Sequence, residues 1–118
     1  MAKRILILDD EPEILTLMQS RLEASGYEVI SAHDGEEGLK IIKNSMPDLI
    51  ITDVAMPQMD GFTFIQEVKK NSDFKKVPVI VLTAKDSLKD IFKIEGIVDY
   101  VVKPFETKTL LEKVNKYI

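Results

Sequence analysis

The sequence predicts an α/β fold in which a parallel β-sheet is covered by helices on both faces. Short apolar runs rich in β-branched residues alternate five times with segments whose apolar residues recur at helical spacing. The connections are short, and no linker, low-complexity tract or internal repeat interrupts them. Such alternation is typical of a doubly wound parallel sheet. The 118 residues are about the length of one domain, so we expect a single domain over residues 1–118.

Composition excludes several function classes. The chain has no cysteine, which rules out disulfides and thiolate chemistry. A formal net charge of −4 argues against nucleic acid or an anionic membrane as the main partner. No apolar run approaches the ~20 residues of a membrane span, and the N-terminus lacks the apolar core of a signal peptide. We therefore expect a soluble cytoplasmic protein.

The first half of the chain supplies three predicted strands and two predicted helices. Pro12 suits the first turn of a helix, and Gly26 is a plausible stop just beyond its end. Asp34, with Glu37 three residues on, resembles a capping box for the second helix, which Pro47 closes. The predicted strands cover residues 5–8 and 27–32 and an apolar run ending at residue 53; the predicted helices cover about 12–25 and 35–45.

The second half supplies two more strands and three more helices. Pro57, Asp60 and Gly61 are typical of a loop that turns before the next helix. Pro78 is tolerable at a strand entry. The predicted strands cover residues 77–82 and 97–102; the predicted helices cover about 62–71, 87–95 and 106–118.

Four predicted strands end in a reactive side chain. The first ends at the pair Asp9 and Asp10, the third at Asp53, the fourth at Thr83 and the fifth at Lys103. Parallel strands place their carboxyl ends along one edge of the sheet, where such folds bind ligands. We therefore expect these side chains, far apart in the chain, to meet in one place.

The residue types at this edge point to phosphoryl chemistry. Three neighbouring carboxylates repel one another, and a hard divalent cation removes the conflict; Mg²⁺ fits, and Mn²⁺ could replace it. A carboxylate beside the cation can act as a nucleophile and form an acyl phosphate. Lys103 would supply positive charge and Thr83 a hydroxyl donor to the phosphoryl oxygens. The sequence thus predicts phosphoryl transfer onto Asp53.

These residues carry a resemblance to a known family. The chain resembles a response-regulator receiver domain of two-component signalling over almost all of its length, and is similar to the single-domain chemotaxis regulators. The matching motifs each follow a predicted strand: Asp9-Asp10-Glu11, Asp53 with Met56-Pro57 and Met59-Asp60-Gly61, Leu82-Thr83-Ala84, and Lys103-Pro104-Phe105.

The resemblance implies a fold and a set of roles. It implies a flavodoxin-like (βα)5 sheet of strand order 2-1-3-4-5 with Asp53 as the phosphoacceptor. Asp10, Asp53 and the backbone carbonyl of Ala55 would ligate Mg²⁺, with Asp9 acting through water. Thr83 and Lys103 would contact the phosphoryl group.

It also implies a switch and partners. Tyr100 matches the family's switch aromatic, which turns inward as Thr83 moves, and the Lys103–Pro104 bond is expected to be cis. The donor would be a histidine kinase or phosphotransfer protein. The recipient would be a downstream target or an output domain absent from this chain. The module would catalyse only its own Mg²⁺-dependent phosphorylation and dephosphorylation.

Two features depart from the family pattern. Nineteen residues separate Thr83 from Lys103, two fewer than receivers commonly have, so the fourth helix or its loops should be shorter. The familiar Gly-Ala before the fifth strand is Gly96-Ile97 here. Both changes lie on the face that receivers usually present to targets.

Three other functions remain as alternatives. A phosphatase of the haloacid-dehalogenase type would need a second Asp where Ala55 stands, and a cap domain. A flavin or nucleotide module would need a Gly-, Ser- or Thr-rich loop where the acidic trio lies. The last alternative is a receiver-like interaction domain that no longer accepts phosphate. His33, the single histidine, is expected to be an exposed loop residue without a role in phosphotransfer.

Overall fold

The computed structural model describes residues 2–54, 60–84 and 96–118. Five parallel strands form one sheet in the order β2-β1-β3-β4-β5, which confirms the expected flavodoxin-like topology. The described elements are β1 (Arg4–Leu8), α1 (Pro12–Ala24), β2 (Glu28–Ala32), α2 (Gly35–Asn44), β3 (Leu49–Asp53), α3 (Gly61–Lys70), β4 (Val79–Ala84), β5 (Ile97–Lys103) and α5 (Thr107–Tyr117). The predicted helix over 87–95 lies outside the described residues.

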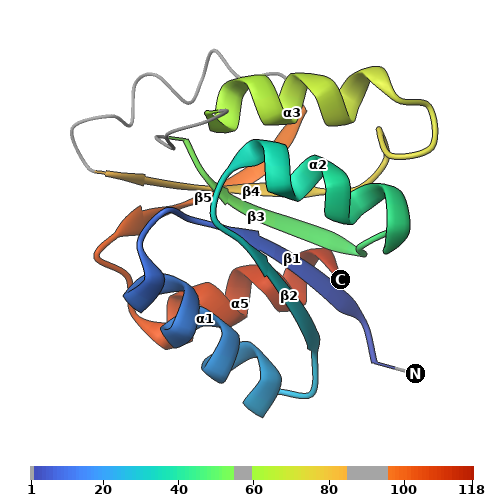
Figure 1. Ribbon diagram of the computed structural model, residues 1–118. Coiled ribbons are helices and arrows are strands. Elements are labelled where there is room, and N and C mark those ends of the chain that lie inside the picture. Colours follow the sequence, from blue (N-terminus) through green and yellow to red (C-terminus); the bar gives the residue numbers. More distant parts are fainter. Residues whose placement is uncertain (1, 55–59, 85–95) are drawn as a thin grey trace.

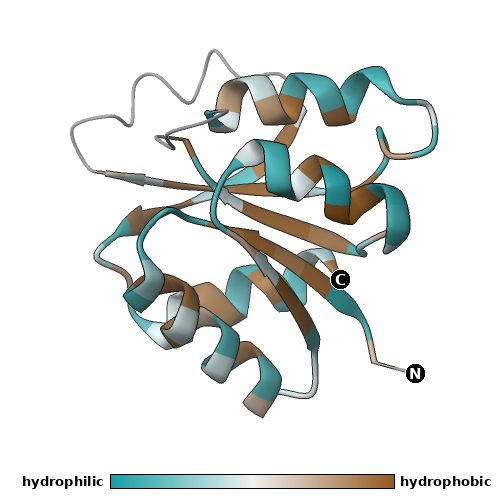
Figure 2. Ribbon diagram, in the orientation of Figure 1, coloured by the Kyte–Doolittle hydropathy of each residue, from teal (hydrophilic) through white to brown (hydrophobic). Residues whose placement is uncertain are grey.

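The helices cover both faces of the sheet. Helices α2 and α3 lie on one face, and α1 and α5 lie on the other (Figure 1). Each face has its own core, one containing Phe64 and Val68 of α3 and the other Met18 of α1 and Val114 of α5. In Figure 2 the hydrophobic colour is concentrated on the strands and on the helix sides that face them. The central strands are buried on both faces, which explains their continuous apolar runs.

Local signals fix most element boundaries. Pro12 is the first residue of α1, where a missing N–H costs nothing, and Gly26 follows the helix with φ at +95°, the left-handed conformation of a helix stop. Strand β4 begins at Val79 rather than at the predicted Val77. The reason is that Pro78 has no N–H for the ladder, although its carbonyl accepts a bond from Ile50 N–H at 3.0 Å.

The predicted capping box at α2 is only half formed. The Asp34 side chain accepts a hydrogen bond from Glu37 N–H at 2.8 Å, as expected. The Glu37 carboxylate, however, accepts from His33 N–H at 3.3 Å and lies 3.3 Å from His33 Nδ1. It therefore bonds the residue before the N-cap, and not the N–H of Asp34 that a capping box would use. His33 is exposed.

Candidate metal centre

Lys103 joins the ends of three strands. It is the last residue of β5, and its Nζ donates to Asp9 Oδ2 at 2.7 Å and to Asp53 Oδ2 at 2.9 Å. Asp9 follows β1 and Asp53 ends β3. Only 17% of the Lys103 side chain is exposed. The structure therefore brings together at one sheet edge the Asp9, Asp53 and Lys103 side chains that the sequence places far apart.

Asp9 carries an unfavourable charge. It is completely buried, and its Oδ1 accepts a bond from Glu11 N–H at 2.9 Å. Burial is the largest influence and raises the pKa of Asp9, although its bonds from Lys103 and Glu11 N–H act in the opposite direction. For Lys103, burial alone would lower the pKa, but its bonds to Asp9 and Asp53 outweigh burial and raise it. The hydrogen bonds to Asp9 thus do not fully offset the cost of burying its negative charge.

The backbone around Asp53 is held by contacts that the sequence did not reveal. The buried Thr52 hydroxyl donates to Asp53 O at 2.8 Å, and Gly61 N–H donates to Val54 O at 2.9 Å. A Cβ at Gly61 would lie 2.3 Å from Asp53 O and 2.7 Å from Val54 Cα. The first turn of α3 can pack against the end of β3 only because residue 61 is glycine. Asp60 is not only a turn residue, since its side chain caps α3 by accepting from Thr63 N–H at 2.8 Å.

The carboxylates at this edge form a cluster suited to a cation. One oxygen from each of Asp9, Asp10, Glu11 and Asp53 lies within 4.8 Å of the others. Oxygens bound to one Mg²⁺ at about 2.1 Å lie up to about 4.2 Å apart, so a small inward movement would suffice. An all-oxygen donor set is what Mg²⁺ prefers. Asp10 and Glu11 are exposed and form the open side of the cluster. The backbone carbonyl of Ala55 lies outside the described residues.

Thr83 and Tyr100 lie on the neighbouring strands β4 and β5. Thr83 is fully buried, and its hydroxyl donates to Ala84 O at 3.2 Å. Tyr100 is half-buried against the core under α2 and α3, and Lys113 Nζ lies 4.6 Å from its ring centroid. The Lys103–Pro104 peptide bond is cis.

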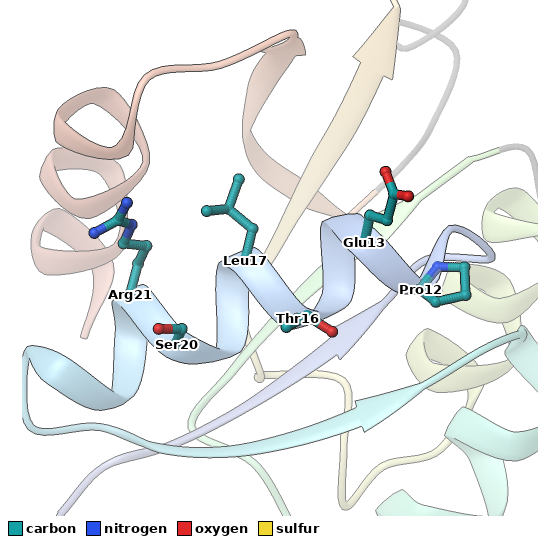
Figure 3. A pocket seen from close by; sticks show the side chains of 6 residues that line it. All are labelled: Pro12, Glu13, Thr16, Leu17, Ser20 and Arg21. Carbon is teal, nitrogen blue, oxygen red and sulfur yellow. The ribbon is translucent and has the colours of Figure 1, made fainter.

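A shallow groove of about 550 Å³ runs along α1. All of its lining residues belong to this one helix, with Glu13, Leu17 and Arg21 along one side and Thr16 and Ser20 along the other (Figure 3). Glu13 is the one carboxylate among the lining residues, so the groove offers no cluster of metal ligands, and we assign it no chemistry.

Comparison with known proteins identifies the family. The family model for the response regulator receiver domain matches residues 5–115. The chain belongs to the response regulator receiver domain family. This family is a class of signalling modules of two-component systems rather than of classical enzymes. Among the described residues, no helix is both long and apolar enough to cross a bilayer.

Curated relatives of this receiver domain are longer proteins. The chain is 43% identical to the "Probable transcriptional regulator ycf27" of Porphyridium aerugineum, over 98% of this chain and 48% of that protein. It is 42% identical to the alkaline phosphatase synthesis transcriptional regulatory protein PhoP of Bacillus subtilis, over 97% of this chain and 48% of that protein. The chain thus spans about half the length of these relatives.

Two solved receiver structures share the fold over all or nearly all of their length. The chemotaxis response regulator CheY4 of Vibrio cholerae superposes with a TM-score of 0.93 at 34% identity, and the match covers 100% of both chains. The receiver domain of the sensor histidine kinase PA1611 from Pseudomonas aeruginosa has a TM-score of 0.90 at 27% identity, covering 99% of this chain and 98% of that one. That structure has a magnesium ion coordinated in its active site cleft.

Proposed function

We propose that residues 1–118 form one receiver domain that accepts a phosphoryl group on Asp53 within a two-component phosphorelay. The observation that carries this proposal is the Lys103 ammonium, which bridges Asp9 and Asp53 at 2.7 and 2.9 Å beside two further carboxylates. A partly buried cation held against an acidic cluster is suited to a reaction that brings a phosphoryl group to that cluster.

In the proposed reaction Asp53 is the nucleophile. One of its carboxylate oxygens forms a bond to phosphorus as the phosphorus–nitrogen bond of a donor phosphohistidine breaks. The donor imidazole is the leaving group, and it departs neutral because its other ring nitrogen keeps its proton. Lys103 already lies 2.9 Å from Asp53 Oδ2, so its ammonium is positioned to contact the oxygens of the group that arrives. Thr83 would donate its hydroxyl to the same oxygens after turning away from Ala84 O.

A divalent cation would complete this site. We propose that Asp10, Asp53 and the backbone carbonyl of Ala55 hold Mg²⁺, or Mn²⁺ in its place, with Asp9 acting through a water molecule. When bound, the ion would offset the carboxylate charge and the charge that develops on the transferred phosphoryl group. Supporting this assignment are the spacing of the carboxylate oxygens and the magnesium ion in the PA1611 receiver structure.

The proposed output is a change of surface. Tyr100 would turn inward as Thr83 moves to the phosphoryl group, shifting the population between two packings. The donor would be a histidine kinase or phosphotransfer protein in the cytoplasm, and the recipient a target protein or an output domain. The chain's only catalysis would be of its own Mg²⁺-dependent phosphorylation and dephosphorylation.

The proposal is tested by intact mass spectrometry. The protein is incubated with Mg²⁺ and acetyl phosphate, and we expect the mass of one phosphoryl group to be added. Asp53→Asn should abolish the addition, whereas the matched variant Asp60→Asn, which keeps an amide cap on α3, should retain it. Addition that survives in Asp53→Asn would refute the site, and rapid turnover of many phosphomonoesters would favour a phosphatase.

A further inference from the structure

Glu11 stands at the open side of the carboxylate cluster. Its backbone is fixed: the N–H donates to Asp9 Oδ1 at 2.9 Å, and the carbonyl accepts from Ile14 and Leu15 N–H at 3.1 Å, in the first turn of α1. Its side chain makes no cap bond to that helix and is 61% exposed. The carboxylate therefore faces solvent beside the buried acids, from a backbone position that the helix start fixes.

Glu11 adds little to holding Lys103 in place. Its Oε1 lies 3.6 Å from Lys103 Nζ, whereas the buried Asp9 and Asp53 oxygens lie at 2.7 and 2.9 Å. The Glu11 end of this ion pair is exposed, so water and salt screen the interaction and make it weak. The main consequence of the Glu11 charge is its field at the mouth of the site.

Charge counting shows how much that field matters. Among residues 2–54, 60–84 and 96–118, Asp9, Asp10, Glu11 and Asp53 bring four negative charges to this site, and Lys103 brings one positive charge. A divalent cation would leave the site with one net negative charge. Without Glu11 the same loaded site would be neutral. Glu11 thus decides whether an incoming phosphorylated anion meets repulsion.

We propose that Glu11 is a specificity-determining residue that slows transfer from small, highly charged phosphodonors to Asp53. The inference rests on the proposed function. Acetyl phosphate, a dianion at neutral pH, would give its phosphoryl group to an Asp53 oxygen while acetate leaves. Phosphoramidate, a monoanion, would react in the same way while ammonia leaves with the proton already on nitrogen. The Glu11 charge repels the acetyl phosphate dianion twice as strongly as the phosphoramidate monoanion. A protein donor can avoid this repulsion by placing a cation or a hydrogen-bond donor beside the Glu11 carboxylate.

The experiment compares Glu11→Gln with Glu23→Gln, which removes the same charge at the far end of α1. Rates of phosphoryl addition to the whole chain are measured by intact mass, at Mg²⁺ that saturates each variant. At low salt we expect Glu11→Gln to react about 3- to 10-fold faster than the wild type with acetyl phosphate. With phosphoramidate, which carries half the charge, the rate should increase by about the square root of that factor. At about 0.5 M KCl both gains should fall toward unity. Glu23→Gln should change neither rate more than about twofold.

Several outcomes would overturn the inference. The first is a rate of phosphoryl addition to Glu11→Gln that equals or falls below the wild-type rate. The others are equal rate increases with both donors, or a rate increase that persists at high salt. Magnesium affinity is measured by calorimetry at high salt, and a loss there of more than about tenfold would make Glu11 a metal ligand instead. A wild-type chain that accepts no phosphoryl group would refute the proposed function itself, whereas labelling at equal rates in wild type and Glu11→Gln would refute only the role of Glu11.

Discussion

Two lysine–carboxylate clusters lie along β5 and differ in charge balance. Near the start of the strand, Lys113 of α5 lies 2.9 Å from Asp99 Oδ1 and also donates to Tyr100 O. Asp99 accepts further bonds from Tyr117 OH at 3.0 Å and Tyr100 N–H at 2.8 Å. One cation meets one fully bonded carboxylate there. At the end of the strand, Lys103 lies within 4 Å of three carboxylates and is the single cation that pairs with them in the part of the chain that the structure describes.

The pKa shifts of the acids in the two clusters run in opposite directions. Burial acts to raise the pKa of Asp99, but the bonds from Lys113, Tyr100 N–H and Tyr117 outweigh it, and the pKa is lowered. At Asp9 burial is the largest influence and the pKa is raised. The first cluster stabilises the fold, since its charges are compensated. The second holds excess negative charge that a cation and a phosphoryl group could use.

The largest expected effect is the loss of Lys103. Lys103→Met would leave Asp9 and Asp53 buried without their cation, and removing one partner of a buried ion pair costs about 3–5 kcal/mol. We expect that decrease in the free energy of unfolding, measured by urea denaturation at neutral pH in EDTA. A loss no greater than that of Lys113→Met would remove the distinction between the clusters.

Magnesium should stabilise the unbalanced cluster. A ligand at about 100 times its dissociation constant adds about 2.7 kcal/mol to the free energy of unfolding when it binds only the folded state. Urea denaturation with and without Mg²⁺ should show this gain in the wild type and little of it in Asp10→Asn. Asp99→Asn should retain the full gain, because Asp99 lies in the other cluster; a loss there would mean that the ion acts elsewhere.

A smaller effect is expected at the balanced cluster. In Lys113→Met the Asp99 carboxylate, 17% exposed, keeps its bonds from Tyr117 and Tyr100 N–H, so we expect a loss of about 1–2 kcal/mol by urea denaturation. Lys116→Met is the matched control, because Lys116 also lies over a tyrosine ring, at 5.3 Å from the Tyr117 centroid. It should change stability by less than about 0.5 kcal/mol, and an equal effect would mean that ring contact alone matters.

The smallest expected effect is the pH dependence. Since the folded pKa of Asp99 lies below 3.8, its stabilisation is present above that pH and is lost as pH falls through the folded pKa. Asp9 has the opposite sign: its raised folded pKa means that acidification toward pH 3.8 relieves a destabilising charge. In EDTA, Asp99→Asn should flatten the acid loss of stability, and Asp9→Asn should remove the gain on mild acidification. Identical pH profiles in both variants would contradict the assignment.

The sequence predicted the fold and the meeting of Asp9, Asp53 and Lys103 because both follow from one rule. Parallel strands present their carboxyl ends at one edge, so a polar residue at the end of an apolar run can be placed without coordinates. The strand ends are sharp here because the central strands are buried on both faces and their apolar runs stop abruptly.

What the sequence could not predict depends on side-chain direction and close approach. Nothing in the motif shows that the Thr83 hydroxyl bonds Ala84 O, since one χ1 rotation redirects it. Position 61 needs glycine because a Cβ there would lie 2.3 Å from Asp53 O, and only the packed structure reveals this clash. The Asp99–Lys113 pair joins a strand to a helix whose relative placement no local pattern fixes. Lys113 and Tyr117 bond the carbonyls of Tyr100 and Val98 on β5, an edge strand, and this too required the topology.

The central claim, that an acyl phosphate forms on one particular aspartate, is tested most directly by borohydride trapping. Sodium borohydride reduces an aspartyl phosphate to homoserine, and peptide mass spectrometry locates the change. After treatment with Mg²⁺ and acetyl phosphate, we expect homoserine at position 53 alone, and none when Mg²⁺ is removed by EDTA. Homoserine at Asp9 or Asp10, or phosphoryl addition that borohydride does not trap, would contradict the account.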